Sequence, residues 1–315
     1  MKEILISKND AGQRLDRFLS KALPLMPASL LQKLIRTKDI KLNGARCERH
    51  QRLSEGDVLR VYADESFFER PAPDAAFMHI KNPSLGIVYE DENILLLDKR
   101  PGMLSHPDDR EFLNTLITHV QAYLYQKGEF DPALENSFMP ALCNRIDRGT
   151  GGIVIAAKNA EAMRAVNEKI RSREIKKLYL CAVHGHPDPP SGKLEGYLVK
   201  DVARNRVRVG SENEDGARHA VTFFRTLARR GPLALLECEL MTGRTHQIRA
   251  QLASIGHPLL GDGKYGVVRK GSGPPHQALY SYKLVFSFKT GAKPLDYLKD
   301  RVFQVEKVDF LDMFY

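Results

Sequence analysis

Apolar and polar side chains follow two different periods within residues 1–63. Over residues 30–40, LLQKLIRTKDI, apolar side chains recur three and four residues apart, which predicts a short amphipathic helix. The stretches KLNGARC and LSEGDVLRVYA follow, with an Asn-Gly pair that is the strongest short signal of a hairpin. These patterns predict a small α/β unit over residues 1–63. The helix is expected to bury Leu30, Leu31, Leu34 and Ile35.

Residues 64–83, DESFFERPAPDAAFMHIKNP, contain three prolines and no sustained period. Proline removes a backbone donor and interrupts helices and strands. We therefore predict a linker without a regular element over residues 64–83, with aromatic side chains that pack on a neighbouring unit.

Strand-length apolar runs and helical periods mix throughout residues 84–315. Strands are predicted within 86–102 (two, joined by a turn), 151–158, 176–186, 205–229 (two), 233–243, 278–288 and 301–315, and helices at 113–127, 160–173 and 245–256. Several hairpins and few strand–helix–strand crossovers favour an α+β fold. We expect one domain over residues 84–315, with a mostly antiparallel, mixed central sheet and flanking helices.

The charge of the chain is uneven. The sequence of 315 residues has a net charge of +9, and residues 1–63 contain 13 basic against 7 acidic side chains. An excess of Lys and Arg favours polyanionic partners, because these cations release counterions when they meet phosphates. A soluble basic protein without such a partner is the alternative, and composition alone does not separate the two.

The sequence gives little support for a membrane or secreted protein, or for a metal-binding protein. No apolar run has the length of a membrane span, and MKEILISKND lacks the apolar core of a signal peptide, so we expect a cytoplasmic protein. The four cysteines form no Cys-x-x-Cys pair, and no acidic or Cys cluster accompanies His184 and His186. We expect no metal and no cofactor.

Asp147 is the first candidate for chemistry. It lies in NRIDRGTGGIVIAAKN, residues 144–159, between Arg145 and Arg148 and before a glycine-rich turn. Neighbouring cations favour the charged carboxylate, and an ionised, positioned Asp can act as a nucleophile or a base. An Asp that only bonds turn amides or pairs with a neighbouring Arg fits the same pattern.

The second candidate cluster is TGRTHQIR, residues 242–249, where Arg244 and Arg249 bracket His246 and Gln247 at a predicted helix start. Thr245 is the expected N-cap. Arg side chains and helix N-termini both suit phosphates and carboxylates, although an ordinary helix start with solvent-facing arginines is equally compatible.

Tyr179, in the predicted strand 176–186, is expected on the face opposite Leu178 and Leu180. If that face lines a cleft, its ring could stack on a nucleobase.

Four motifs together resemble those of a known family. RIDRGTGG, KKLYLCAVHG, TGRTHQIRAQLASIGHPLLGDGKYG and ILLLDKRPGMLSHP resemble, in content and order, the motifs of the RluA-type pseudouridine synthases. The resemblance covers residues 85–290. RLDRFLSKALP and LLQKLIRTKDIKLNG resemble the small αL-type RNA-binding domain first known from a ribosomal small-subunit protein.

The resemblance implies the pseudouridine synthase fold and the isomerisation of uridine to pseudouridine in structured RNA, without metal or cofactor. By the same resemblance Asp147 is the nucleophile, which attacks the base or ribose C1′. Tyr179 packs on the target base and is a candidate to help remove the C5 proton, and Arg249 pairs with Asp147. Further RNA contacts are expected from Asn144, Arg145, Arg148, Arg244, His246, Gln247, Lys33, Arg36 and Lys41.

Large-subunit ribosomal RNA is the favoured substrate by analogy of architecture, with tRNA as the alternative. We expect the protein to act as a monomer.

Two residues depart from the family's pattern. Asn144 stands where the family has a His, and Gly151 where it has a Ser, which we expect to loosen the turn that aims Asp147. These departures motivate a second hypothesis, an RNA-binding or ribosome assembly factor with the same fold and no catalysis. The presence of Asp147, Tyr179 and Arg249 favours catalysis. A metal-dependent nucleotide hydrolase would need clustered ligands that the sequence lacks.

Overall fold

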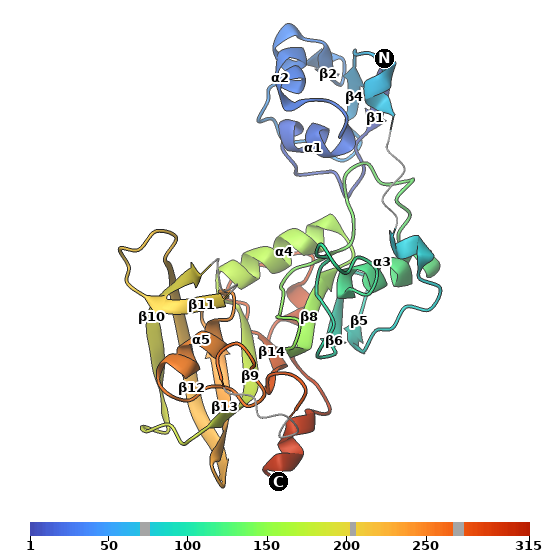
Figure 1. The fold of residues 1–315 in the computed structure, drawn as a ribbon. Coiled ribbons are helices and arrows are strands. Elements are labelled where there is room, and N and C mark those ends of the chain that lie inside the picture. The colour runs from blue at the N-terminus through green and yellow to red at the C-terminus, as the bar shows by residue number, and fades with distance from the viewer. Residues whose placement is uncertain (70–75, 202–205, 267–273) are drawn as a thin grey trace.

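Two separate β-sheets organise the chain, a small one near the N-terminus and a large one after it (Figure 1). The computed structural model describes residues 1–69, 76–201, 206–266 and 274–315. No helix within these ranges is both long enough and apolar enough to cross a bilayer.

The small sheet has the strand order β1-β4-β2-β3 and is antiparallel throughout. Its elements are β1 (Lys2–Leu5), α1 (Leu15–Ala22), α2 (Ala28–Thr37), β2 (Ile40–Leu42), β3 (Ala45–Arg46) and β4 (Val58–Val61). Helix α2 and the hairpin β2–β3 are as predicted, and the turn residues Asn43 and Gly44 have positive φ angles of 51° and 78°. Leu31, Leu34 and Ile35 are buried, whereas Leu30 is only partly buried.

The predicted linker is wrong in one respect, because it contains two short 3-10 helices. They are η1 (Glu65–Phe68) and η2 (Ala76–His79), and residues 70–75 between them lie outside the described residues. Phe67 and Phe68 pack against the core of the small unit, and Phe77 is buried in the core under the large sheet. The aromatic residues therefore pack on the neighbouring units, as expected.

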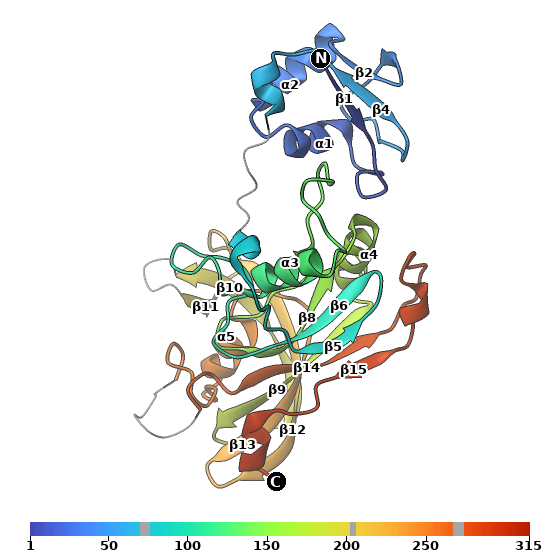
Figure 2. The ribbon, with the colours of Figure 1, turned by 90° about the vertical axis from the view of Figure 1, so that its right-hand side faces the viewer.

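Polar contacts join the small unit to the rest of the chain. Asp10 is fully buried, and its carboxylate accepts hydrogen bonds from Ser137 Oγ at 2.6 Å and Asn136 Nδ2 at 2.8 Å. Asn9 Oδ1 accepts from the backbone N–H of Ala160 at 3.1 Å. In both views the small unit lies beyond the helices α3 (Leu116–Gln126) and α4 (Ala160–Arg171) (Figures 1 and 2).

The large sheet has the order β11-β10-β12-β13-β9-β14-β8-β6-β5, with β15 beside β14 and β7 beside β8. Its strands are β5 (Ile87–Glu90), β6 (Ile94–Lys99), β7 (Ala141–Leu142), β8 (Gly151–Ala157), β9 (Ile175–His184), β10 (Ser191–Asp201), β11 (Arg206–Gly210), β12 (Arg218–Arg230), β13 (Leu233–Leu240), β14 (Leu279–Phe286) and β15 (Val302–Gln304). Of the strand pairs within the described ranges, β8–β14 alone is parallel. The predicted α+β fold with a mostly antiparallel sheet is confirmed.

Strand β10 has no counterpart among the predicted strands. Its sequence, SGKLEGYLVKD, combines two glycines with charged residues and only a few apolar ones, and buried residues appear only near its end. An antiparallel strand one position from the sheet edge needs only one partly covered face, so its sequence carries a weak apolar signal.

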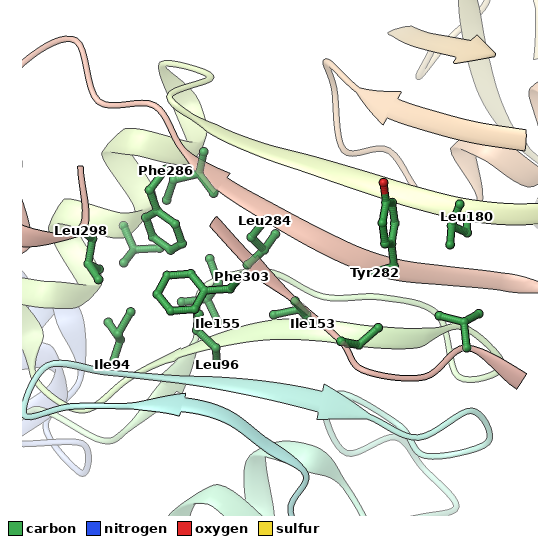
Figure 3. Close-up of a cluster of buried hydrophobic side chains, with 14 of the residues drawn as sticks. Ile94, Leu96, Ile153, Ile155, Leu180, Tyr282, Leu284, Phe286, Leu298 and Phe303 are labelled. Atoms are coloured by element: carbon green, nitrogen blue, oxygen red, sulfur yellow. The ribbon is translucent and has the colours of Figure 1, made fainter. Parts of the chain in front are cut away.

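Both faces of the central strands are buried. Ile153, Ile155 and Leu180 face one core together with α4 and the C-terminal segment (Figure 3). Val154 and Tyr179 face the opposite core, with α3 and α5 (Gln247–Ser254). Because successive side chains of a strand point to opposite faces, burial on both faces explains the continuous apolar runs of β6 and β8.

Lys99 ties two segments together at the end of β6. Its buried Nζ donates to the backbone carbonyls of Arg100 at 3.2 Å, Met103 at 2.8 Å and Arg148 at 3.2 Å. The turn after β6 is therefore held against the residue that follows Asp147. Burial lowers the pKa of Lys99 to about 8, although the nearby carboxylates of Asp147 and Asp98 act in the opposite direction.

We predict that Gly152→Ala strongly destabilises the protein. Gly152 has a φ of +111°, and an added Cβ would lie 2.3 Å from the backbone oxygen of Ser281 on the neighbouring strand. Strain and backbone overlap together should lower the free energy of unfolding by about 3 kcal/mol or more, measured by urea denaturation. Gly256→Ala is the matched control, since Gly256 also has a positive φ, +85°, but open space around it. Equal losses in the two variants would contradict the overlap.

We predict that Lys99 makes stability depend on alkaline pH. Folded Lys99 loses its proton near pH 8, whereas the unfolded side chain keeps it to pH 10.5. Between these values the unfolded chain binds more protons, so raising the pH favours the folded state. From pH 8 to 10.5 the wild type should gain up to about 3 kcal/mol relative to Lys99→Met. Parallel stability curves, or a Lys99 Cε NMR resonance that titrates near pH 10.5, would contradict this.

Candidate active site

A cavity of about 290 Å³ lies between the loop that precedes β8, strand β9 and the start of α5. Its size is close to the lower end of ligand pockets in proteins, about 300 Å³. The sequence-predicted residues that line it are Asn144, Arg145, Asp147, Tyr179, Arg244, His246, Gln247 and Arg249. Segments about a hundred residues apart in sequence therefore meet at one site. Arg148 and the three predicted residues of the small unit are not in its lining.

Asp147 presents one oxygen to an arginine and leaves the other open. Arg249 Nη1 donates to Asp147 Oδ2 at 2.9 Å. Oδ1 has no hydrogen-bond partner among the described residues, and the side chain is 22% exposed. The backbone carbonyl of Asp147 accepts from Thr150 N–H at 3.0 Å, which forms the turn into β8. The carboxylate is therefore anchored on one side and accessible on the other.

Asp262 holds Arg249 in place, and the sequence analysis gave it no role. Arg249 Nε and Nη2 donate to the two oxygens of Asp262 at 2.7 and 2.9 Å, in the two-pronged geometry typical of Arg–carboxylate pairs. Asp262 is 1% exposed. Burial alone would raise its pKa, but the Arg249 guanidinium outweighs burial and lowers it. The only signal in the sequence was the position of Asp262 between two glycines in LLGDGKYG.

The start of α5 differs from the prediction. The N-cap residue is His246, in a left-handed conformation with φ 53° and no capping hydrogen bond from its side chain, so the Thr245 cap was wrong. Gln247 stabilises the turn that precedes the helix, since its Oε1 accepts from the backbone N–H of Arg244 at 3.0 Å. Its Nε2 donates to the carbonyl of Val221 at 3.0 Å, and the residue is 3% exposed. Gln247 therefore makes its hydrogen bonds within the protein.

Tyr179 forms a buried wall of the cavity. It lies on the face of β9 opposite Leu178 and Leu180, as its alternation predicted. Burial raises the pKa of Tyr179 to about 12, so its phenol carries a proton at neutral pH.

The two departures from the family pattern have local structural explanations. Asn144 Oδ1 accepts from the backbone N–H of Ile155 in β8 at 2.8 Å, so its amide is turned toward the sheet. An added Cβ on Gly151 would lie 2.3 Å from the ring of Tyr280. Gly151 is buried inside β8, so the expected loosening of a turn there does not describe this position.

Three exposed arginines, Arg145, Arg148 and Arg244, lie in two of the segments that form the cavity, although Arg148 is not among its lining residues. Arg145 is exposed and lines the cavity. Arg148 Nε donates to the carbonyl of Gly102 at 3.0 Å, and Arg244 Nε donates to the carbonyl of His219 at 3.0 Å. The last two are therefore held by backbone acceptors and still expose part of their guanidinium groups.

A second, basic groove lies on the small unit. Lys33 and Arg36 of α2 line it together with Arg46 and Arg49, two arginines that the sequence analysis did not select. Lys41 is not among its lining residues, and its Nζ lies 5.6 Å from the ring centre of Tyr62. The sequence predicted the cations of the helix but not those that the following segment brings beside them.

Within the described residues, no group of three or more His, Cys, Asp or Glu side chains could hold a metal ion. His186 Nε2 instead lies 3.0 Å from the carbonyl oxygen of Gly231.

Known proteins are similar to this chain over nearly its full length. An uncharacterized RNA pseudouridine synthase of Mycoplasma capricolum is 30% identical over 305 residues, 96% of this chain and 96% of that protein. The ribosomal large subunit pseudouridine synthase D of Zymomonas mobilis is 30% identical over 94% of this chain and 92% of that protein.

The solved structure of human RNA pseudouridylate synthase domain containing 4 has a TM-score of 0.57 and 21% identity, and covers 72% of this chain and 90% of that one. This likeness shows the fold. The family model described as RNA pseudouridylate synthase matches residues 93–254, which include Asp147, Tyr179 and Arg249. The chain therefore belongs to the RNA pseudouridine synthase family, and it is an isomerase of that family.

Proposed function

We propose that this enzyme isomerises specific uridines to pseudouridine in structured RNA, with large-subunit ribosomal RNA as the favoured substrate and Asp147 as the nucleophile. One observation carries the proposal. The Asp147 carboxylate is fixed through Oδ2 by Arg249, while Oδ1 has no partner among the described residues and the side chain lines a cavity. An anchored carboxylate with a free oxygen is suited to attack an electrophilic carbon.

The reaction sets requirements that this cavity can meet. The bond between ribose C1′ and N1 breaks, uracil turns, and a bond from C1′ to C5 forms while the C5 proton leaves and N1 gains one. The target base must first leave its stack and enter a pocket. Asp147 attacks either the base or C1′ in this proposal.

Tyr179 packs on the flipped base in this proposal. Aromatic side chains are common platforms for extruded bases, and Tyr179 is a cavity wall on the same side of the sheet as Arg249. Its protonated phenol is suited to packing and to donating a hydrogen bond at neutral pH.

Cations around the cavity would bind the phosphates that flank the target nucleotide. Arg145, Arg148 and Arg244 have this role in the proposal. Phosphate contacts position an RNA but carry no sequence information, so they do not identify the uridine.

We also propose that residues 1–63 form a separate αL-type RNA-binding domain, joined by residues 64–83 to the catalytic domain 84–315. The separate sheet, the separate core and the basic groove of the small unit support this division. Lys33 and Arg36 would contact RNA inside the groove, and Lys41 beside it.

The preference for large-subunit ribosomal RNA rests on relatives, such as that of Zymomonas mobilis, whose names state that substrate. tRNA is the second candidate. The monomeric state and the cytoplasmic location stay predictions from the sequence.

We predict that Asp147→Asn abolishes tritium release from RNA labelled at uridine C5. The amide cannot act as the nucleophile, so the rate should fall at least about 10³-fold. The assay uses ribosomal RNA transcripts and bulk tRNA in parallel, so that the responding RNA identifies the substrate class. Asp312→Asn is the control, because it makes the same chemical change at an exposed residue near the C-terminus.

Tritium release that survives in Asp147→Asn would remove Asp147 as the nucleophile. Tight RNA binding without release by the wild type, on every RNA, would favour the non-catalytic factor.

We predict that Lys33→Ala with Arg36→Ala weakens RNA binding without lowering the rate on saturating RNA. Two phosphate contacts would be lost, so the slope of log affinity against log salt should fall by about 2. Lys299→Ala with Lys307→Ala is the control, with the same charge change at exposed residues outside both cavities. If both double variants lowered RNA affinity and the salt slope equally, Lys33 and Arg36 would contribute only through the net charge of the protein.

A further inference from the structure

His246 has a strained backbone beside Asp147. Its φ of 53° and ψ of 22° lie in the left-handed region, which residues other than glycine seldom adopt. The strain does not serve helix capping, because the side chain makes no capping hydrogen bond. The conformation instead places Nε2 3.8 Å from Asp147 Oδ2, with the side chain only 12% exposed.

The other ring nitrogen of His246 meets Tyr265. His246 Nδ1 lies 2.9 Å from Tyr265 Oη, and the two rings are edge to face at 84°. Tyr265 Oη also accepts a hydrogen bond from the backbone N–H of Val207 at 2.7 Å. The guanidinium of Arg249 lies 5.2 Å from the centre of the Tyr265 ring, so the same tyrosine packs against both neighbours of Asp147.

Counting protons fixes the direction of the hydrogen bond between His246 and Tyr265. A tyrosine hydroxyl has one proton to donate, and among the described residues its sole acceptor is His246 Nδ1. If Nδ1 carried a proton instead, the half-buried Tyr265 hydroxyl would face a second donor and lose its acceptor among the described residues. Tyr265 therefore donates to Nδ1.

The surroundings of His246 favour the neutral imidazole. Burial lowers its pKa, and together with the cations Arg249 and Lys264 it outweighs the carboxylates of Asp147 and Asp262, which raise it. A neutral imidazole has one proton, and with Nδ1 accepting from Tyr265 that proton is on Nε2, the nitrogen that faces Asp147.

We propose that Tyr265 holds His246 in the Nε2–H tautomer, and that His246 and Arg249 together fix Asp147 Oδ2 and leave Oδ1 as the attacking oxygen. His246 and Tyr265 are positioning residues, since they act through Asp147. The gap of 3.8 Å exceeds a hydrogen bond and closes when RNA binds, as catalytic hydrogen bonds often tighten in the substrate complex. The consequence for Asp147 rests on the proposed function.

This arrangement also excludes His246 as the base that removes the C5 proton. With one nitrogen protonated and the other engaged by Tyr265, His246 has no free lone pair for the C5 proton.

The test is Tyr265→Phe, which keeps the ring against Arg249 and removes the hydroxyl. Tyr282→Phe is the matched control, because its hydroxyl also bonds one side-chain acceptor, the carboxylate of Glu237, and Tyr282 belongs to the core that Ile153 and Leu180 face, away from Tyr179 (Figure 3). Single-turnover rates with the responding RNA, RNA affinity and histidine ring 15N NMR are measured for the full chain, with His246→Gln to assign the resonance.

We expect the Nε2–H tautomer in the wild type and in Tyr282→Phe, and a loss of that preference in Tyr265→Phe. The single-turnover rate should fall about 10- to 100-fold in Tyr265→Phe alone, the order that misplacement of a reacting group costs, with RNA affinity unchanged. The lost bond stabilised neutral imidazole, so the pKa of His246 should rise and the acidic limb of the rate profile should move to higher pH.

An Nδ1–H tautomer in the wild type, or an unchanged rate profile in Tyr265→Phe, would overturn the proposal. Equal rate losses in both Tyr→Phe variants would also overturn it and indicate a general loss of stability. If the wild type is inactive on every RNA, the proposed function fails, whereas the NMR spectra still decide whether Tyr265 sets the tautomer.

Discussion

The active site depends on one buried guanidinium, that of Arg249, which lies between two carboxylates. Burying a charge is costly unless the charge is paired and hydrogen-bonded. Arg249 meets this condition, because two of its N–H groups donate to Asp262 and a third donates to Asp147. Asp262 is fully enclosed and makes both of its oxygens available, so the guanidinium plane has little freedom to rotate. Asp262 therefore sets the direction of the third donor, and with it the orientation of the Asp147 carboxylate. Asp262 itself does not line the cavity.

The sheet supplies the second constraint, because it is covered on both faces. Each central strand places alternate residues in different cores. Because Leu178 and Leu180 face one core, Tyr179 must lie on the other face, the one it shares with Arg249. Asp147 enters this face from a loop that is fixed just after it, by the bond from Lys99 to the carbonyl of Arg148 and by the start of β8. A shift of one residue in β8 would bring Gly152 out of register with Ser281, where only a glycine fits.

Most of the fold could be predicted because burial on two faces leaves a clear trace in sequence. The runs ILLL and GIVIAA are too short for helices and too apolar for exposed strands. Strand β10 lacked such a trace, since its polar residues and glycines fit a loop equally well. Local patterns and the family resemblance selected eight of the residues that line the cavity. Asp262 and Tyr265 were not selected, because their roles depend on long-range contacts that no local period encodes.

The start of α5 shows why a local rule fails at such a site. Thr245 is a good N-cap by residue type, yet the helix begins two residues later, and His246 takes a left-handed conformation. The Gln247 side chain instead bonds the backbone N–H of Arg244 in the turn that precedes the helix. The side chain of His246 makes no capping bond, and its imidazole lies between Tyr265 and Asp147. The helix start therefore departs from the local capping rule at the residue that lies beside the Asp147 carboxylate. Such departures are expected at functional sites.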